Sequence, residues 1–336
     1  MVTETRRDGR SPGDADFRLL GPVEVVVDGR AIELGGVRQR ALLALLVLHA
    51  NEVVSRDFLI DELLGERPPA SAEHSIVVYV SRLRKALQAH GADQVPMLGT
   101  KSGGYVLRVD PAQIDVKRFE RALEQGDRAL AEGAVSDAAE MLRSACAEWR
   151  GEQLSDLVSA PFVEGASCRL AELRLAALES RIDADMALGR HAALVGELES
   201  LVRRNQLNER LCAQLMVALY RSGRQARALE VYRSTRRFLD DELGIEPAED
   251  LQRLERAILR HDRELDAPVV GSAGRASLPS PGGAPVGQTH QQRKTVSVLV
   301  AGVDPVAQGE RADTEALRLT TARYLGVIKA AIERHG

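Results

Sequence analysis

Residues 71–87 place apolar and polar positions on opposite sides of a predicted helix. At about 100° per residue, one side carries Ile76, Tyr79, Val80, Leu83 and Leu87. The other side carries Ser71, His74, Val78, Ser81, Arg82 and Lys85, and no carboxylate follows Glu73. Because phosphates repel carboxylates and attract donors, this pattern predicts a helix that packs through one face and offers the other to a polyanion.

A short hairpin is predicted directly after this helix. Residues 97–100 and 105–109 alternate as two strands, and Lys101-Ser102-Gly103-Gly104 supplies the turn. Residues 17–34 also predict strands, with Asp28-Gly29 as a hairpin turn. Between them lie two predicted helices, 38–49 and 56–64, and Ser55 is placed to cap the second. This order predicts a winged helix-turn-helix over residues 17–110, after a disordered N-terminus of residues 1–16.

The region 111–265 has an almost wholly helical pattern and repeats itself. Leu188-Gly189-Arg190-His191 and Ser222-Gly223-Arg224-Gln225 lie 34 residues apart, which is the tetratricopeptide period. Stacked helix pairs share a core that no single pair could bury, and they leave a surface for a partner. The predicted fold class is therefore mainly α: a winged helix-turn-helix followed by a tetratricopeptide-like (TPR-like) helical domain.

The remaining residues predict two further segments. Proline, glycine and serine dominate residues 266–293, which indicates a flexible linker. Residues 294–336 predict one buried-type strand and one amphipathic helix, a partial α/β segment that is too small for a domain by itself.

Composition excludes several classes of protein. The chain has a formal net charge of −4, and residues 16–109 are close to charge-balanced, so a DNA-binding role would depend on local charge. Three widely spaced cysteines give neither a disulfide framework nor a zinc site, and no motif for a cofactor or a catalytic nucleophile is present. The longest apolar run, residues 41–48, is too short to cross a membrane, so we expect a cytoplasmic protein without cofactor or metal.

The N-terminal unit resembles the OmpR-type winged helix of SARP-type bacterial transcriptional regulators. The resemblance rests on residues 38–87 and on Gly-Gly-Tyr-Val-Leu-Arg-Val at 103–109. The helical region resembles the bacterial transcriptional activator domain (BTAD), notably in residues 219–247. The resemblance implies a cytoplasmic, non-enzymatic transcription regulator, most readily an activator, with a place in phosphorelay signal transduction.

In such proteins the third helix enters the major groove and the wing touches the adjacent backbone. Carried over to this sequence, the resemblance implies a set of DNA-contacting residues: Ser71, His74, Ser81, Arg82, Arg84, Lys85, Lys101 and Ser102. Arg84 lies on a flank of the helical wheel and is expected to meet phosphate or a carboxylate. The implied partners are double-stranded DNA with promoter repeats, and either a second copy of the chain or RNA polymerase.

Two other functions stay open at this point. Residues 294–336 resemble the opening of a class III nucleotidyl cyclase domain, which would make the chain the regulatory part of a signalling enzyme. However, Ala301-Gly302-Val303 stands where such a domain carries a metal-binding aspartate. The second alternative is a scaffold whose winged helix binds protein, which the balanced charge of residues 16–109 permits.

Overall fold

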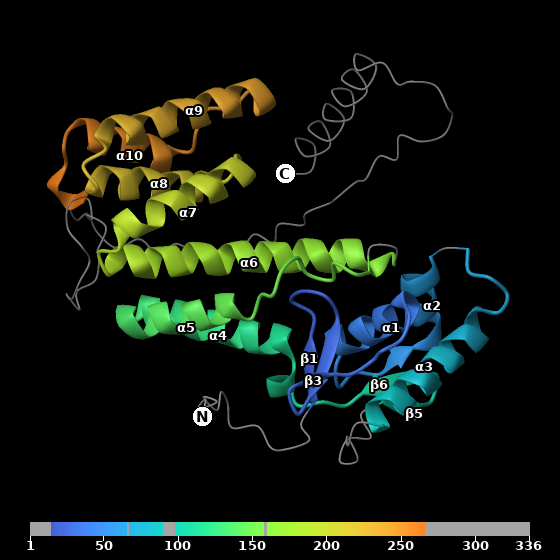
Figure 1. Ribbon diagram of the computed structural model, residues 1–336. Coiled ribbons are helices and arrows are strands. Elements are labelled where there is room, and N and C mark those ends of the chain that lie inside the picture. Colours follow the sequence, from blue (N-terminus) through green and yellow to red (C-terminus); the bar gives the residue numbers. More distant parts are fainter. Residues whose placement is uncertain (1–14, 66, 90–97, 158–159, 266–336) are drawn as a thin grey trace, which may run out of the picture. The chain divides into compact units, whose positions relative to one another are not determined.

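The structure is a computed structural model that describes residues 15–65, 67–89, 98–157 and 160–265 (Figure 1). The predicted linker of residues 266–293 and the predicted α/β segment of residues 294–336 lie outside the described residues. The first strand begins at Ala15, two residues before the expected start of the winged-helix domain.

A small antiparallel sheet opens the described chain. It consists of β1 (Ala15–Arg18), β2 (Glu24–Val27) and β3 (Arg30–Ala31), in that order. Val27 pairs with Arg30 across the turn, and the two turn residues Asp28 and Gly29 have φ values of 48° and 78°. Both angles lie in the left-handed region, which Asp-Gly tolerates and which a two-residue hairpin requires. The hairpin predicted at Asp28-Gly29 is confirmed.

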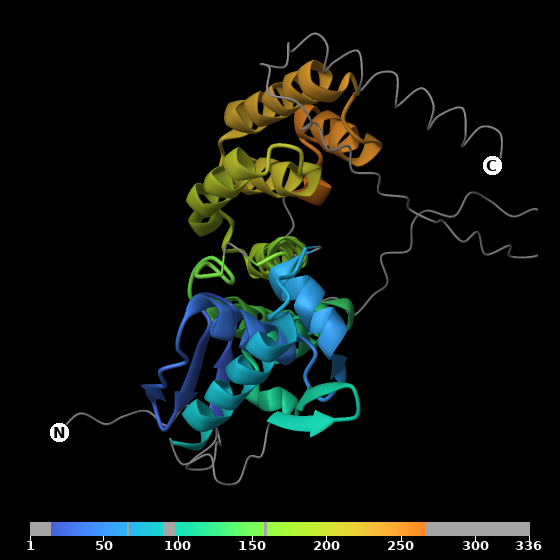
Figure 2. The same cartoon turned by 90° about the vertical axis from the view of Figure 1, so that its right-hand side faces the viewer.

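Three helices and a second sheet complete the winged helix (Figures 1 and 2). The helices are α1 (Val37–Leu48), α2 (Arg56–Leu64) and α3 (Ala72–Gln88). Ser55 caps α2 as expected, since its hydroxyl accepts a hydrogen bond from the Phe58 backbone N–H at 3.1 Å. The wing is the hairpin of β5 (Leu98–Lys101) and β6 (Gly104–Leu107). An additional strand, β4 (Val54–Ser55), was not predicted; it pairs with β6 and makes the sheet order β4-β6-β5.

Gly104 allows β4 and β6 to approach closely. It pairs with Ser55, and a Cβ built on Gly104 would lie 2.8 Å from the carbonyl carbon of Val54, closer still to the carbonyl oxygen. Both are backbone atoms, so a methyl group could be accommodated only by separating the strands.

We expect Gly104→Ala to destabilise the chain by about 1–3 kcal/mol, the usual cost of overpacking, and to weaken the DNA binding expected from the sequence by displacing the wing. Urea unfolding and a binding titration measure the two effects. Gly196→Ala is the matched control, because its added Cβ meets nothing within 4 Å in the middle of α7 (His191–Arg204). Equal stability of the two variants would contradict the close approach of β4 to β6.

The helical region contains seven α-helices over the described residues 115–259. Besides α7 they are α4 (Asp115–Ala131), α5 (Val135–Ala147), α6 (Phe162–Ala187), α8 (Glu209–Arg221), α9 (Gln225–Leu243) and α10 (Glu249–Leu259). Short 3₁₀ turns, η1 (Pro111–Gln113) and η2 (Arg263–Leu265), flank them.

The turns between paired helices repeat one geometry. Gly133, Gly189 and Gly223 have φ values of 79°, 77° and 72° at the ends of α4, α6 and α8. In each turn the residue after the glycine donates its N–H to a carbonyl five residues earlier: Ala134 to Ala129, Arg190 to Asp185, and Arg224 to Leu219, at 2.9–3.0 Å. This is the glycine-terminated helix end that lets two helices pack antiparallel. The predicted TPR-like helical fold is confirmed.

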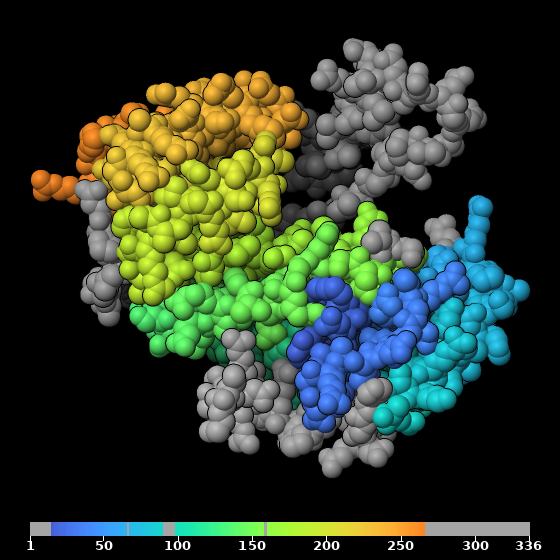
Figure 3. Space-filling model, in the orientation of Figure 1, coloured from blue at the N-terminus to red at the C-terminus, as the bar shows by residue number. Residues whose placement is uncertain are grey.

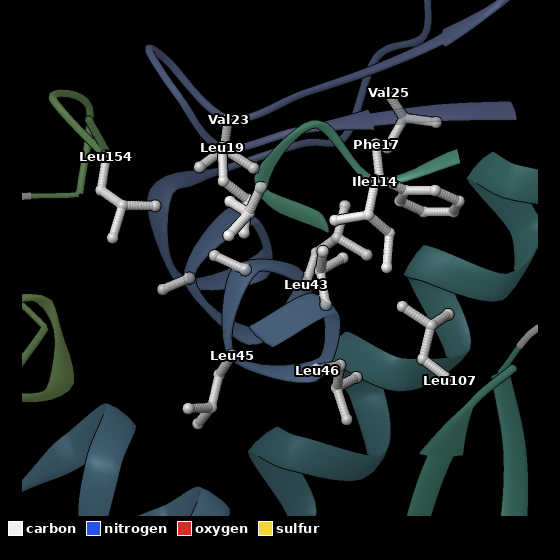
Figure 4. Close-up of a cluster of buried hydrophobic side chains, with 14 of the residues drawn as sticks. Phe17, Leu19, Val23, Val25, Leu43, Leu45, Leu46, Leu107, Ile114 and Leu154 are labelled. Carbon is white, nitrogen blue, oxygen red and sulfur yellow. The ribbon is translucent and has the colours of Figure 1, made fainter. Parts of the chain in front are cut away.

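The hydrophobic core does not stop at the boundary between the winged helix and the helical region. One cluster of buried side chains runs from β1 and α1 through β6 into α4, α5 and α6. Figure 4 shows part of it, with Ile114 and Leu154 of the helical region beside Phe17, Leu19 and Leu43. A second cluster lies among α6–α10. The helices α4–α6 therefore share their core with the winged helix, and α7–α10 have another.

None of the helices in the described part of the chain is both long enough and apolar enough to span a bilayer.

Candidate nucleic-acid interface

Helix α3 has one buried and one exposed face. Ala72, Ile76, Val80, Leu83 and Leu87 are buried and pack toward α1 and α2. The exposed positions after Glu73 are His74, Val77, Ser81, Arg82, Lys85 and Gln88. Successive positions lie three or four residues apart, except for the adjacent pair Ser81 and Arg82, so together they form a continuous strip along one side of the helix. Figure 3 shows the surface of the molecule, with the segment that contains α3 in cyan.

The donors on this face are available to a ligand. The side chains of His74, Ser81, Arg82 and Lys85 make no hydrogen bond or ion pair with another residue that the structure describes. Glu73 is the one carboxylate of α3, and it lies in the first turn. The strip carries two permanently charged cations, Arg82 and Lys85, and no carboxylate follows Glu73 on α3. This charge pattern suits the phosphate-lined edge of a DNA groove.

The wing lies beside α3 and carries a cation at its tip (Figure 2). Lys101 and Ser102 are both exposed, as expected for a hairpin that contacts the sugar-phosphate backbone of DNA. Ser71 is exposed directly before α3, and its carbonyl accepts a hydrogen bond from the Ser75 hydroxyl. The structure thus brings the predicted residues of α3 and of the wing to one region.

Arg84 has a different environment from the other predicted residues. Its guanidinium donates to the Leu98 carbonyl and to the Thr100 hydroxyl, each at 2.8 Å. Both acceptors belong to β5, so Arg84 connects α3 to the wing. DNA contact by Arg84 stays a prediction; what the geometry shows is a brace that holds the wing against the helix.

Two residues of this region were not predicted from the sequence. Arg56 is exposed at the start of α2, its guanidinium lies 5.8 Å above the Tyr105 ring, and its backbone N–H bonds to the carbonyl of Gly103 in the wing turn. It adds a cation beside the wing turn, and the sequence signal that could have found it is a basic residue directly after the predicted cap Ser55. The second is Val77, because the helical wheel had placed Val78 outward, whereas Val78 is half-buried and Val77 is 46% exposed.

A buried carboxylate fixes the winged helix to the helical region. Asp115, at the start of α4, accepts hydrogen bonds from the backbone N–H groups of Leu19, Leu20 and Val116 at 2.7–2.9 Å. Burial raises the pKa of Asp115 from its ordinary 3.8 to about 6, against the opposing effects of these N–H groups and of Arg150. The turn between β1 and β2 is thereby held by a residue of the helical region.

Ion pairs surround this contact. Arg118 of α4 bonds to Asp16 of β1 at 2.9 Å and to Glu148 at 2.7 Å. Arg40 of α1 pairs with Asp156 at 2.5 Å, and Asp156 also accepts the Val23 N–H. We call the set formed by Asp16, Asp115, Arg118, Glu148 and Asp156 the interdomain clamp. The interdomain clamp fixes the winged helix, and with it α3, in one orientation relative to the first helices of the helical region.

Comparison with known proteins matches two family models to the chain. Residues 29–107 match the model "Transcriptional regulatory protein, C terminal", and residues 114–259 match the model "Bacterial transcriptional activator domain". Regulatory protein DnrI of Streptomyces peucetius is 39% identical over 269 residues, which cover 78% of this chain and 99% of DnrI. The chain belongs to the SARP family of bacterial transcriptional regulators.

Other SARP relatives extend well beyond the matched region. Regulatory protein AfsR of Streptomyces coelicolor is 41% identical over 270 residues, and this chain covers only 26% of its length. A solved structure, "Mycobacterium tuberculosis EmbR in complex with low affinity phosphopeptide", matches with a TM-score of 0.71 and 38% identity over 75% of this chain and 68% of that one. The resemblance of residues 294–336 to a cyclase falls outside the described residues and outside both family matches.

Membership of the family shows the function of the chain at the level of the whole protein. This SARP-type protein is a DNA-binding transcriptional regulator with an OmpR-type winged helix and a BTAD. DNA is accordingly its partner, and its relatives are regulators. The expected fold and DNA as a partner are confirmed, whereas the second copy or RNA polymerase and the individual DNA-contacting residues remain predictions.

Proposed function

We propose that this regulator is a sequence-specific transcriptional activator that inserts α3 into the major groove of promoter half-sites. The observation that carries the proposal is the exposed strip of α3, whose donors have no partner among the described residues and which lacks carboxylates after Glu73. An α-helix fits the major groove, where each base pair presents its own pattern of donors and acceptors.

The exposed residues of α3 and the wing fall into two groups, candidates for contacts with base edges and candidates for contacts with phosphates. His74, Ser81 and Arg82 stand on α3 as candidates for base edges, because an imidazole, a hydroxyl and a guanidinium donate hydrogen bonds to purine acceptors. Lys85 and the wing residues Lys101 and Ser102, with Arg56 behind them, suit phosphate contacts that fix the register. Ser71, at the beginning of α3, suits a phosphate at the edge of the groove.

We infer that two copies act together on repeated half-sites. The winged helix is nearly charge-balanced, so one unit has few cations with which to neutralise phosphates. A single small winged helix also contacts too few base pairs for specificity in a genome. The helices α6–α10 supply the surface for self-association, and contact with RNA polymerase is the alternative use of that surface. Such a role belongs in the cytoplasm, where bacterial DNA lies.

The test is selection of fragments of the chain's own genome by the full-length protein, with binding measured across a range of salt concentrations. We expect enrichment of fragments that carry a repeated motif, with an affinity that falls steeply as salt rises. Absence of enrichment at low salt would refute the proposal and favour a winged helix that binds protein. Enrichment of a single, unrepeated motif would refute paired binding alone.

The spacing of the half-sites should match the helical repeat of DNA. Two winged helices held by associated helical domains reach the same side of the duplex when the half-sites lie about 10–10.5 base pairs apart, or a multiple of this distance. Insertion of half a turn between them should lower affinity by about tenfold or more, because linked sites then no longer bind together. A gel-shift titration of the two DNAs measures the difference. An equal insertion outside the motif is the control, and equal affinities for all three DNAs would contradict the model.

A further inference from the structure

Val77 is an exposed apolar side chain in the middle of the strip on α3. Its exposure of 46% sets it apart from the buried stripe of Ile76, Val80 and Leu83, and it does not belong to the core cluster of the winged helix. Of the large apolar side chains that are exposed in the described residues, Val77 is the one on α3. Its exposure is therefore not explained by the packing of this helix.

The neighbours of Val77 point outward with it. His74, Val77, Ser81 and Lys85 follow each other at intervals of three, four and four residues, which is one line along a helix. The valine is thus flanked by an imidazole on one side and a hydroxyl on the other. In a DNA groove, His74 and Ser81 can reach hydrogen-bonding atoms of the bases, and Val77 then contacts the part of the base edges that lies between these atoms.

The major groove contains one apolar group that such a side chain can meet. Thymine alone among the four bases presents a methyl group there, and apolar side chains recognise thymine through it. Valine suits this contact because its branched side chain keeps one rotamer in a helix, so its two methyl groups lose little freedom on binding. A helix that bound only the phosphate backbone would gain nothing from an apolar residue at the centre of its exposed face.

We propose that Val77 is a specificity-determining residue that contacts the 5-methyl group of a thymine in each half-site. The proposal rests on the proposed function, since it requires that α3 enters the major groove. It assigns to Val77 the reading of one base pair that the hydrogen-bonding residues of the strip do not cover.

The experiment replaces each thymine of the selected motif in turn by deoxyuridine, which removes only the methyl group. With the full chain, we expect one thymine per half-site at which uracil lowers affinity about threefold to fivefold, the factor for burial of one methyl group. Val77→Ala should lower affinity for the thymine DNA by a similar factor and abolish the difference between thymine and uracil. Leu259→Ala, at another exposed apolar position at the end of α10, should leave the difference intact.

The outcomes separate this proposal from the proposed function. Tight binding that is insensitive to uracil at every position, or a difference that persists in Val77→Ala, would overturn the assignment of Val77 while leaving the regulator's DNA binding intact. A motif without a thymine in each half-site would do the same. No binding to any DNA by the wild-type chain would overturn the proposed function itself. Because Val77 lies outside the core, circular dichroism of Val77→Ala should match that of the wild type.

Discussion

Replacement of Arg82 and Lys85 together by alanine is expected to lower the affinity of the full chain for its promoter DNA by about 100-fold, because the variant lacks the proposed base contact, worth about 1–3 kcal/mol, and one proposed phosphate contact. Both side chains are exposed and make no bond to another described residue, so the fold should be unaffected. The slope of log affinity against log salt should also become shallower by about 0.9 for each phosphate that the variant no longer neutralises. Fluorescence anisotropy at several salt concentrations measures both quantities.

A matched variant distinguishes this loss from a general effect of charge. Arg233 and Arg237 are exposed on α9, away from the strip on α3. Arg233→Ala/Arg237→Ala removes the same two charges and should change neither the affinity nor the salt slope by more than about twofold in Kd, as expected for charges outside the interface. Equal losses in the two double variants would contradict the placement of DNA on α3.

The second large effect concerns the interdomain clamp. Asp115→Ala should lower the free energy of unfolding by about 3–5 kcal/mol, because three backbone N–H groups would lose their acceptor in a buried site. Two of these donors, Leu19 and Leu20, belong to the β1–β2 turn of the winged helix. Urea denaturation gives the value. Asp137→Ala is a suitable control, since Asp137 lies in the first turn of α5 and does not take part in the clamp. A loss no larger than that of the control would show that the turn is held by other contacts.

Asp115 also gives the stability a defined pH dependence. Its pKa is about 6 in the folded chain, against an ordinary value of 3.8, because the carboxyl is buried. Between about pH 4 and 6 the folded chain therefore keeps a proton that the unfolded chain has released, and this contribution falls by about 3 kcal/mol as the pH rises through the window. Asp115→Asn lacks this titration, so the stability difference between wild type and variant should shrink from pH 4 to pH 7. A difference that stays constant or grows would contradict the raised pKa.

Local patterns were sufficient to predict most of the elements. The alternation around Asp28-Gly29, the cap at Ser55 and the apolar stripe of α3 each depend on neighbours in the sequence, and the structure confirms all three. The repeat spacing between Gly189 and Gly223 was likewise visible in the sequence, because the first helix of each pair ends in the same glycine turn. β4 escaped prediction because a strand of two residues has no periodicity, and its existence depends on β6, which lies far along the chain.

The features that could not be predicted are long-range contacts. Asp115 and Leu19 are separated by 96 residues, so nothing near either one indicates that the carboxylate caps the β1–β2 turn. The continuous core has the same origin. The sequence pattern changes between residues 110 and 111, but Ile114 lies beside Phe17 and Leu154 lies on the side of Leu19, all in one cluster. A change in pattern marks a change of element type, which is not the same as a boundary between cores.

Within the site, the helical wheel was accurate to about one residue. It placed His74, Ser81, Arg82 and Lys85 outward, which the structure shows, but chose Val78 in place of Val77. The two valines are adjacent in the sequence, and the structure exposes Val77 while Val78 is half-buried against the neighbouring elements. Arg84 illustrates a second limit, because a cation near the reading face can hold the wing through the Leu98 carbonyl.

The central claim is that α3 enters the DNA groove within each half-site. The most direct test is to map the position of α3 on bound DNA. Gln88→Cys at the end of α3, in a chain that also carries Cys146→Ser and Cys168→Ser to remove the partly and fully exposed thiols, offers a single accessible attachment point for an iron-chelate cleavage reagent. Cys212 is buried, and this burial raises the pKa of its thiol, so little reactive thiolate is present at neutral pH. If α3 enters the groove, strand cleavage will be centred within each half-site of the selected motif, and the same reagent on Ser234→Cys of α9 will give none there. Cleavage confined to DNA outside the motif, or identical from both positions, would contradict it.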